Sequence, residues 1–284
     1  MIVLTGTDGF IGKNLFEYFS TNTSERILTV DFNSEIGPFD FLERLQKDKF
    51  KNIQVIIHNG ACSDTMCCDP HFMMKHNFDY TSSLFKHCLN NDIRMIYASS
   101  ASVYGDGPFC EAAFPKPKNL YALSKSLFDN YSSYFNSNVV GLRYFNVYGK
   151  YEEDKKHMAS VVYKFFVQKN SGKIKLFEKS ENYLRDFLHV DDVCEITYKI
   201  FKNKKIFGIF NIGTGEERSF LDIANLFKKK YNIEIETIPM PAELVSTYQK
   251  FTKSDNTKFK KFITHNYLSL EQGVDRYLRY LENK

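Results

Sequence analysis

A glycine-rich turn between two apolar segments constrains this chain more than any other feature. In the stretch VLTGTDGFIGKNL, Gly6, Gly9 and Gly12 recur at every third position. Where a strand runs into a helix, such glycines permit a tight turn, let backbone N–H groups approach a pyrophosphate, and bring the helix close to the strand. The turn therefore predicts a dinucleotide-binding unit, provided that a strand precedes it and a helix follows.

An acidic residue beyond the next expected strand supports that interpretation. Asp31 follows the strand Ile27–Val30, where a carboxylate can accept hydrogen bonds from the ribose hydroxyls of the cofactor. Residues 32–34 supply no cation for a 2′-phosphate, which favours NAD over NADP. The cofactor contacts predicted from this region are Gly6, Gly9, Phe10, Ile11, Gly12, Asp31 and Phe32.

Short β-branched runs alternate with longer amphipathic ones along the chain, which is typical of an α/β fold with a parallel, doubly wound sheet. We expect ligands at the carboxyl ends of its strands. The expected strands are Ile2–Thr5, Ile27–Val30, Val55–His58, Arg94–Ala98, Val139–Tyr144 and one from Gly208. The expected helices are Gly12–Ser20, Phe72–Leu89, Tyr121–Tyr134 and one capped by Ser219.

Composition narrows the class of partner. The 284 residues can bury one large core, or a core and a smaller lobe, and the net charge is +4. The longest basic run, Lys228–Lys230, ends an expected helix, where cations suit the helix dipole, so nucleic acid is not indicated. An anionic small molecule is the partner that this mild positive charge favours.

No sequence feature indicates a membrane, a metal site or a disulfide. No apolar run approaches the length that spans a bilayer, and the chain opens directly on a strand, so we expect a cytoplasmic protein. The six cysteines lack the paired spacing of zinc ligands, and we expect them to remain thiols.

Small and polar residues follow the third expected strand in the stretch IIHNGACS. They let the backbone touch a cofactor at this strand end, next to the glycine turn. The predicted contacts here are Asn59, Gly60, Ala61, Cys62 and Ser63.

A tyrosine and a lysine four residues apart, Tyr121 and Lys125, share one face of an expected helix. A nearby ammonium group and a positive nicotinamide ring lower the pKa of a phenol, which can then take a proton from a substrate hydroxyl while hydride leaves the same carbon. Lys125 would also hold the nicotinamide ribose. Ser100, at the end of the fourth strand, can hydrogen-bond the substrate oxygen.

Together these motifs resemble the extended short-chain dehydrogenase/reductase superfamily, as do LRYFNVYG from Leu142 and RDFLHVDDV from Arg185. The resemblance implies a Rossmann-like doubly wound sheet with a smaller α/β substrate lobe, and a nucleotide sugar as substrate. It assigns residues 1–147 and about 186–215 to the NAD(P)-binding domain, and residues 148–185 and 216–284 to the substrate lobe.

Longer stretches are similar to one family of that group, the ADP-glycero-manno-heptose 6-epimerases. They are HNGACSDT, FMMKHN, YFNVYGKYEEDKKHMASV, LFEKSENYLRDF, GIFNIGTG and YQKFT. The resemblance implies oxidation of C6 to a transient carbonyl and re-reduction on the opposite face, to supply heptose for the lipopolysaccharide core. The alternatives are a sister 4-epimerase or dehydrogenase on another nucleotide-heptose or hexose, such as a GDP-heptose, and a catalytically silent NAD(P)-binding protein. Silent relatives usually lose the tyrosine or lysine that this chain keeps.

The same resemblance implies a second acid/base opposite the tyrosine, a lysine that falls at Lys155, or at Lys156 if the register slips by one. We expect the rest of this charge run, Lys150 and Glu152–Asp154, to face water, and an apolar helix to follow from Met158. Further implied cofactor contacts are Asn77 and Val147, and implied substrate contacts are Asn146, Phe177, Glu178, Lys179, Ser180, Arg185 and Tyr248.

The resemblance also implies tightly bound NADP, against the lean of Asp31 towards NAD, and a homo-oligomer, commonly a pentamer. This chain departs from the family pattern at three positions, which the resemblance places around the diphosphate and the cofactor phosphate: a glycine is replaced by Lys179, a serine by His157 and a histidine by Lys164. The base of the nucleotide, ADP or GDP, therefore stays open.

Overall fold

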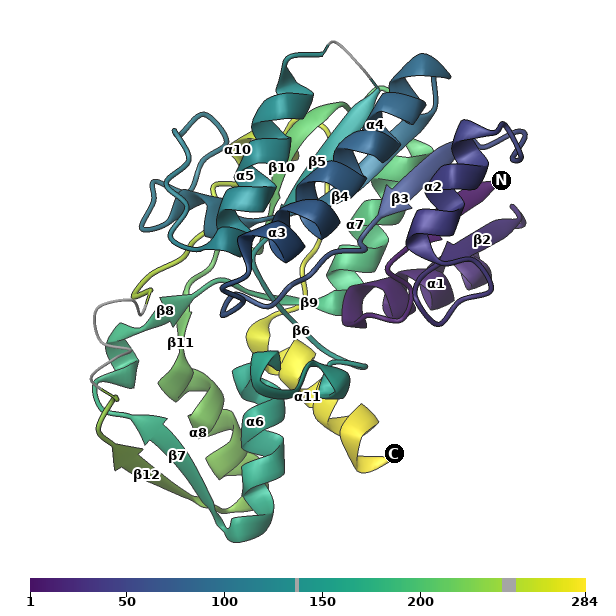
Figure 1. Ribbon diagram of the computed structural model, residues 1–284. Coiled ribbons are helices and arrows are strands. Elements are labelled where there is room, and N and C mark those ends of the chain that lie inside the picture. The colour runs from purple at the N-terminus through teal and green to yellow at the C-terminus, as the bar shows by residue number, and fades with distance from the viewer. Residues whose placement is uncertain (136–137, 242–248) are drawn as a thin grey trace.

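The computed structural model describes residues 1–135, 138–241 and 249–284 (Figure 1). A parallel sheet of six strands lies at its centre, in the order β10-β5-β4-β3-β1-β2. Strands β2 and β3 lie on opposite sides of β1, so the topological switch point lies between β1 and β3. The strands are β1 (Ile2–Thr5), β2 (Ile27–Val30), β3 (Val55–His58), β4 (Arg94–Ser100), β5 (Val139–Tyr144) and β10 (Gly208–Ile212).

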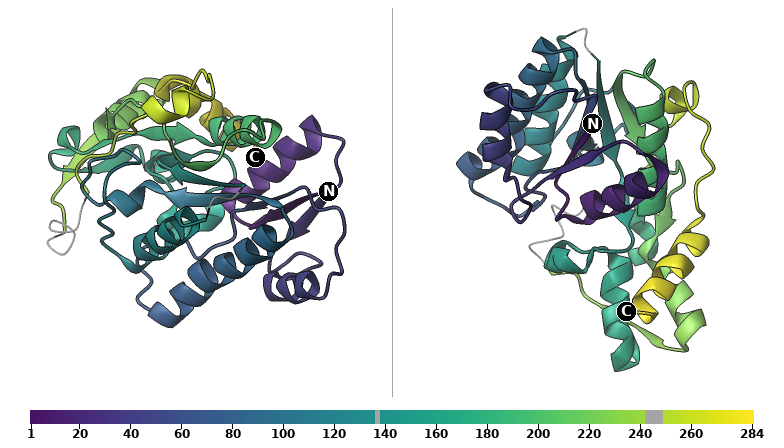
Figure 2. Two further views of the ribbon diagram at one scale, coloured as in Figure 1. Left: turned by 90° about the horizontal axis from the view of Figure 1, so that it is seen from above. Right: turned by 90° about the vertical axis from the view of Figure 1, so that its right-hand side faces the viewer.

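Helices cover both faces of the sheet (Figure 2). Its strands are therefore apolar on both faces, as is typical of parallel sheets. The strands β1, β3 and β5 are buried along their full length. Helices α1 (Phe10–Asn22) and α7 (Val190–Lys202) pack on one face, with Leu15 and Ile196 in its core. Helices α2 (Pro38–Gln46), α4 (Tyr80–Asn90) and α5 (Leu120–Ser133) cover the other. The predicted α/β fold class, and every predicted strand, is confirmed.

One helix differs from its prediction. In place of a single helix over Phe72–Leu89, a short α3 (Pro70–Met73) passes through a π-helical turn at Met74–Asp79 into α4. The wider turn directs Asn77 inward, where the side chain is buried and hydrogen-bonds Cys62 and Ser124. Periodicity alone could not reveal this change of pitch, because a π turn only shifts the apolar pattern by one residue.

Segments from the second half of the chain form a smaller lobe, which lies below the large sheet in Figure 1, beyond the carboxyl ends of its strands. Its apolar core, which includes Val162, Leu176 and Phe227, packs helices α6, α8 and α11 against the parallel pair β7–β12. The elements that follow β5 in the chain, apart from α7 and β10, are β6 (Asn146–Tyr148), α6 (Val161–Gln168), β7 (Lys173–Phe177), β8 (Leu184–Arg185), β9 (Phe187–His189), β11 (Arg218–Ser219), α8 (Phe220–Tyr231), β12 (Glu234–Ile238), α10 (Thr257–Lys260) and α11 (Leu270–Glu282). As predicted, Ser219 caps α8, in a capping box with Asp222.

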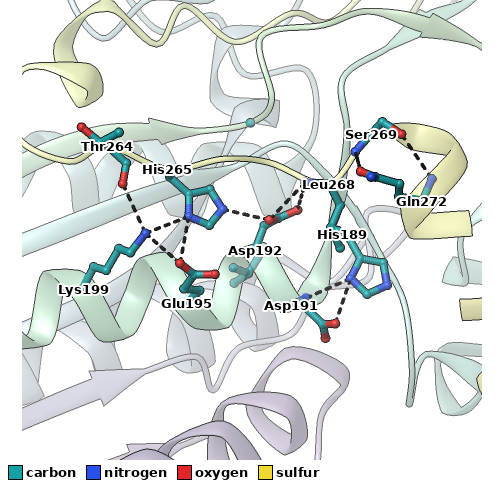
Figure 3. A network of polar contacts seen from close by, with 12 residues as sticks. His189, Asp191, Asp192, Glu195, Lys199, Thr264, His265, Leu268, Ser269 and Gln272 are labelled. Atoms are coloured by element: carbon teal, nitrogen blue, oxygen red, sulfur yellow. Dashed lines mark hydrogen bonds and ion pairs between the residues drawn. The ribbon is translucent and has the colours of Figure 1, made fainter. Parts of the chain in front are cut away.

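The C-terminal segment returns to the large sheet before it enters α11. Phe259 packs into the core beside β10, although the predicted division assigns residues 216–284 to the substrate lobe. A polar network then ties this segment to α7: His265 Nε2 lies 2.8 Å from Asp192 Oδ1, and Lys199 Nζ donates to the carbonyl of Thr264 at 3.2 Å (Figure 3). The domain division stays a prediction.

The glycine turn joins β1 to α1 by backbone contact. Gly6 has a φ of +79°, and a Cβ on it would lie 2.5 Å from the nitrogen of Gly60 at the end of β3. A Cβ on Gly12 would lie 1.9 Å from the carbonyl oxygen of Gly6. Both glycines are therefore required by packing at the switch point.

We predict that Gly12→Ala lowers the free energy of unfolding by at least about 1–3 kcal/mol, because the added methyl group forces α1 away from β1. Urea denaturation measures the change. Gly37→Ala is the matched control, since no atom lies within 4 Å of its Cβ position and its φ is −71°. Gly37→Ala should change stability by less than about 0.5 kcal/mol, and an equal loss in both variants would contradict the prediction.

Candidate active site

A cleft of about 1060 Å³ opens at the carboxyl ends of the central strands. One wall comes from the glycine turn and from the ends of β3, β4 and β5, and the other from the segment before α6, α6 itself and β7. The predicted residues that line it are Gly6, Gly9, Phe10, Ile11, Gly12, Asn59, Ala61, Ser63, Ser100, Tyr121, Lys125, Asn146, Val147, Lys155, Phe177 and Ser180. The fold thus brings residues far apart in sequence to one cavity.

Asp31 lies just beyond β2, and its carboxylate orders the neighbouring backbone. It accepts hydrogen bonds from the N–H of Asp8 at 2.7 Å and of Phe32 at 2.8 Å. Phe32 is 68% exposed. The acid therefore faces the glycine turn, although neither residue lines the cleft.

Asn77, Gly60 and Cys62 lie one layer behind the cleft wall. The amide of Asn77 accepts from the N–H of Cys62 at 2.8 Å and donates to its carbonyl at 2.9 Å, which fixes the loop after β3. The N–H of Gly60 donates to Thr5 Oγ1 at 3.2 Å. In the described part of the chain, the buried Oδ1 of Asn59 has no hydrogen-bond partner.

The predicted tyrosine–lysine pair lies on the first turns of α5, which Asn119 caps by accepting from the N–H of Ala122. The Lys125 ammonium is buried, donates to the carbonyl of Ala98 at 2.8 Å, and lies 5.9 Å from the centre of the Tyr121 ring. This places the end of β4, which carries Ser100, beside the pair.

Burial acts on the pKa of both members of the pair. It raises the pKa of Tyr121, and a hydrogen bond with Ser100 opposes that rise. It lowers the pKa of Lys125 to about 8, because the ammonium form loses its hydration. The predicted lowering of the phenol pKa, which includes the effect of a positive nicotinamide ring, stays a prediction.

The charge run at 150–157 does not simply face water. The side chain of Glu152 is fully buried, Lys150 is bound to Glu17 on α1, and Glu153 is bound to Lys284 on the C-terminal segment. Asp154 is exposed and pairs with Lys13 at 2.8 Å. The expectation of a solvated run is thus wrong for Glu152, because the loop folds back so that this carboxylate accepts hydrogen bonds from Gly149 and Ser160.

Of the two candidate lysines, Lys155 lines the cleft and Lys156 does not. The ammonium of Lys155 lies 5.3 Å from the centre of the Phe10 ring, and burial lowers the pKa of Lys155. Lys156 is exposed, with a φ of +52°. The helix expected from Met158 begins at Val161, capped by Ser160.

The predicted substrate residues are placed unevenly. Glu178 and Lys179 are exposed and lie outside the cleft wall, and Lys179 has the positive φ of +60° that suits a glycine. Arg185 is buried, with its guanidinium donating to the carbonyls of Leu184 and Gln249. Tyr248 lies outside the described residues.

Several residues of the second wall were not predicted from the sequence as cleft residues. Ser160, Lys164 and Gln168 recur every fourth position on α6 and line the cleft, as does Lys175 on β7. The signal was present: polar residues at i, i+4 and i+8 interrupt an otherwise apolar helix. Burial lowers the pKa of Lys164.

Within residues 1–135, 138–241 and 249–284, no group of three or more His, Cys, Asp or Glu side chains could hold a metal ion. No helix in those ranges is long and apolar enough to cross a membrane. All six cysteines are free thiols.

We predict a pH-dependent stability difference between the protein and Lys125→Met. Below pH 8 the ammonium is charged in both states and burial penalises the folded one; between pH 8 and about 10.5 the unfolded state binds more protons, so stability rises with pH. Over this window, the free energy of unfolding of the wild type should rise by up to about 1.4 kcal/mol per pH unit relative to that of the variant. Urea denaturation of cofactor-free protein measures it, and parallel curves would contradict the pKa of Lys125.

Comparison with known proteins gives this geometry a family. The model of the NAD dependent epimerase/dehydratase family matches residues 2–213. The ADP-L-glycero-D-manno-heptose-6-epimerase of Brachyspira hyodysenteriae is 40% identical, over 99% of this chain and 98% of its own.

Solved structures agree. The ADP-L-glycero-D-manno-heptose-6-epimerase of Helicobacter pylori superimposes with a TM-score of 0.86 at 29% identity, over 99% of this chain and 96% of that one. The UDP-glucose 4-epimerase of Thermotoga maritima shares the fold, with a TM-score of 0.84 at 23% identity over 99% and 98% of the two chains. Sequence, fold and cleft together show that this chain belongs to the NAD dependent epimerase/dehydratase family.

Proposed function

We propose that this protein epimerises ADP-glycero-manno-heptose at C6, through a transient carbonyl, in the supply of heptose for the lipopolysaccharide core. One observation carries the proposal: Ser100 from β4 and Tyr121 and Lys125 from α5 share a cleft with Lys155, which comes from the segment before α6. Acid/base groups on opposite walls suit a reaction that takes the hydroxyl proton on one side and returns a proton to the carbonyl oxygen after the carbonyl has turned over. The names of the Brachyspira and Helicobacter relatives support the choice of substrate.

The residues at the glycine turn fit a dinucleotide. Gly6 and Gly12 leave no room for a side chain, and Gly9, whose Cβ position is 3.4 Å from the Gly6 carbonyl, exposes backbone to the cleft. The unpartnered Oδ1 of Asn59 lies at the same strand end. When bound, the nicotinamide would accept and return the hydride. Asn77, Cys62 and Val147 would shape its pocket from the β3 and β6 sides.

Proton transfer falls to side chains of this chain. Tyr121 would take the proton of the substrate hydroxyl, with Ser100 holding that oxygen and the Lys125 ammonium stabilising the phenolate. Lys125 can keep its hydrogen bond to the carbonyl of Ala98 in this role, since an ammonium has three donors. Lys155 would act as the acid/base on the carbonyl oxygen after the carbonyl has turned over.

The remaining predicted contacts would hold the sugar and its diphosphate. Asn146, Phe177 and Ser180 line the cleft, and Arg185 holds the carbonyl of Gln249, which also lines it. Glu178, Lys179 and Tyr248 remain predicted contacts of the nucleotide. We further propose a cytoplasmic homo-oligomer, for which the family resemblance suggests a pentamer.

Tyr121→Phe and Lys155→Met should each slow epimerisation by about 10²–10⁴-fold, because each removes one proton-transfer group. The measurement is inversion at C6 of ADP-glycero-manno-heptose, followed by NMR, with bound cofactor quantified in each variant. Lys156→Met is the matched control and should keep its activity, since Lys156 is exposed.

Three outcomes would contradict this proposal. Exchange at C4 in place of C6 would indicate the sister 4-epimerase, and net accumulation of reduced cofactor a dehydrogenase. Full activity in Lys155→Met with loss in Lys156→Met would place the second base at the neighbouring lysine.

We expect the purified protein to release NAD when denatured, because an acid such as Asp31 after the second strand suits ribose hydroxyls, and residues 32–34 carry no cation for a 2′-phosphate. Mass spectrometry of the released nucleotide identifies it. Recovery of NADP would instead favour the cofactor that the heptose epimerase resemblance implies.

A further inference from the structure

The carboxylate of Glu152 lies behind the cleft wall and closes the loop that carries Lys155. It is fully buried and does not line the cleft. It accepts hydrogen bonds from the N–H of Ser160 at 2.7 Å, from the Ser160 hydroxyl at 2.6 Å and from the N–H of Gly149 at 3.3 Å. Because Gly149 begins the loop and Ser160 ends it, one side chain holds both ends together.

The same clamp positions two cleft lysines. The N–H of Lys155 donates to the carbonyl of Glu152 at 3.0 Å, and the N–H of Lys164 donates to the carbonyl of Ser160 at 3.1 Å. Both side chains line the cleft, Lys155 from the loop and Lys164 from the first turn of α6. Moving Glu152 would therefore move both lysines.

Two charged groups act on Lys155. The carboxylate of Glu152 opposes the loss of a proton from Lys155, and the ammonium of Lys164 favours it. Glu152 acts in the same way on Lys164. From α1, Lys155 meets the uncharged ring of Phe10.

The neighbouring acids are already engaged elsewhere. Asp154 pairs with Lys13 on α1, and Glu153 with Lys284. The phenols of Tyr148 and Tyr277 face Glu152 from β6 and α11, and burial raises the pKa of each, so they add no charge near neutral pH. One buried anion thus acts on two cleft lysines, and it forms an ion pair with neither of them.

We propose that Glu152 and Lys164 are positioning residues for Lys155: Glu152 holds the Lys155 loop at the cleft through Gly149 and Ser160, and Lys164, on the helix that Ser160 caps, places a second cation beside Lys155 in the same cleft. This rests on the proposed function for the use of the proton. The charge arrangement itself can be measured without turnover.

Competitive acetylation of the full-length protein with trace acetic anhydride tests the proposal. Only neutral amines react, so the pH midpoint of labelling at Lys155, read by mass spectrometry of its peptide, reports its protonation. The exposed Lys156 of the same loop normalises the reagent.

Lys164→Gln should raise the midpoint of Lys155 and slow its labelling about three- to tenfold at a fixed pH below it, because a neighbouring cation is lost. Glu152→Gln should lower the midpoint and speed labelling by a similar factor. Lys164→Arg keeps the charge and should restore the wild-type midpoint. Lys175→Gln removes another cation of the same cleft and should leave the midpoint unchanged.

Opposite shifts in the two Gln variants support the proposal, since simple loosening of the loop would speed labelling in both. Shifts in the same direction, or unchanged midpoints, would overturn it. If Glu152→Gln does not fold, the Lys164→Gln and Lys164→Arg pair decides: equal midpoints in those two variants overturn the role of Lys164, and with it the proposal.

The pH dependence of C6 inversion connects this result to the reaction. The limb that belongs to Lys155 should move in Lys164→Gln in the direction and by the amount that labelling shows. Labelling shifts as predicted in a protein that does not invert C6 would sustain the charge arrangement and refute only the proposed function. Inversion with unshifted labelling would do the reverse.

Discussion

The buried ion pair between Asp129 on α5 and Arg143 on β5 holds the candidate active site to the sheet. Arg143 Nε donates to Asp129 Oδ2 at 2.8 Å, and both side chains are almost fully buried. A buried pair persists only where its remaining donors and acceptors are satisfied. Here Tyr97 and Ser99 of β4 donate to the same carboxylate, and Arg143 donates to the hydroxyl of Tyr104. The helix that carries the tyrosine–lysine pair therefore cannot slide along the strands beneath it.

The second wall of the cleft is held by a different device, a single carboxylate that binds backbone and hydroxyl donors. Among the residues that the structure describes, no lysine or arginine forms an ion pair with Glu152, and three hydrogen bonds compensate its burial. Burial still raises its pKa. The two walls thus differ in kind: the sheet side is rigid through a charge pair, and the α6 side depends on the bonds of one loop.

Sequence reasoning succeeded where a local pattern and a backbone rule coincide, as at Gly6 and Gly12, and where Tyr121 and Lys125 share a helix face. It failed where burial depends on distant partners. Glu152 reads as one more charge in a solvated run, because nothing nearby in sequence reveals that Ser160 lies against it. The burial that raises the pKa of Tyr121 could not be seen in the sequence for the same reason, since desolvation depends on the assembled walls.

The attachment of α11 to the Lys155 loop makes the last residues of the chain part of the architecture of the cleft. Glu153 contacts Tyr280 and Lys284, and a Cβ on Gly273 of the same helix would collide with the Tyr148 hydroxyl. During synthesis, the glycine turn and most of the large sheet emerge first and can fold as a unit. The loop that carries Lys155 acquires these contacts only when α11 has left the ribosome, so the glycine turn is formed before the chain can assemble both walls of its cleft.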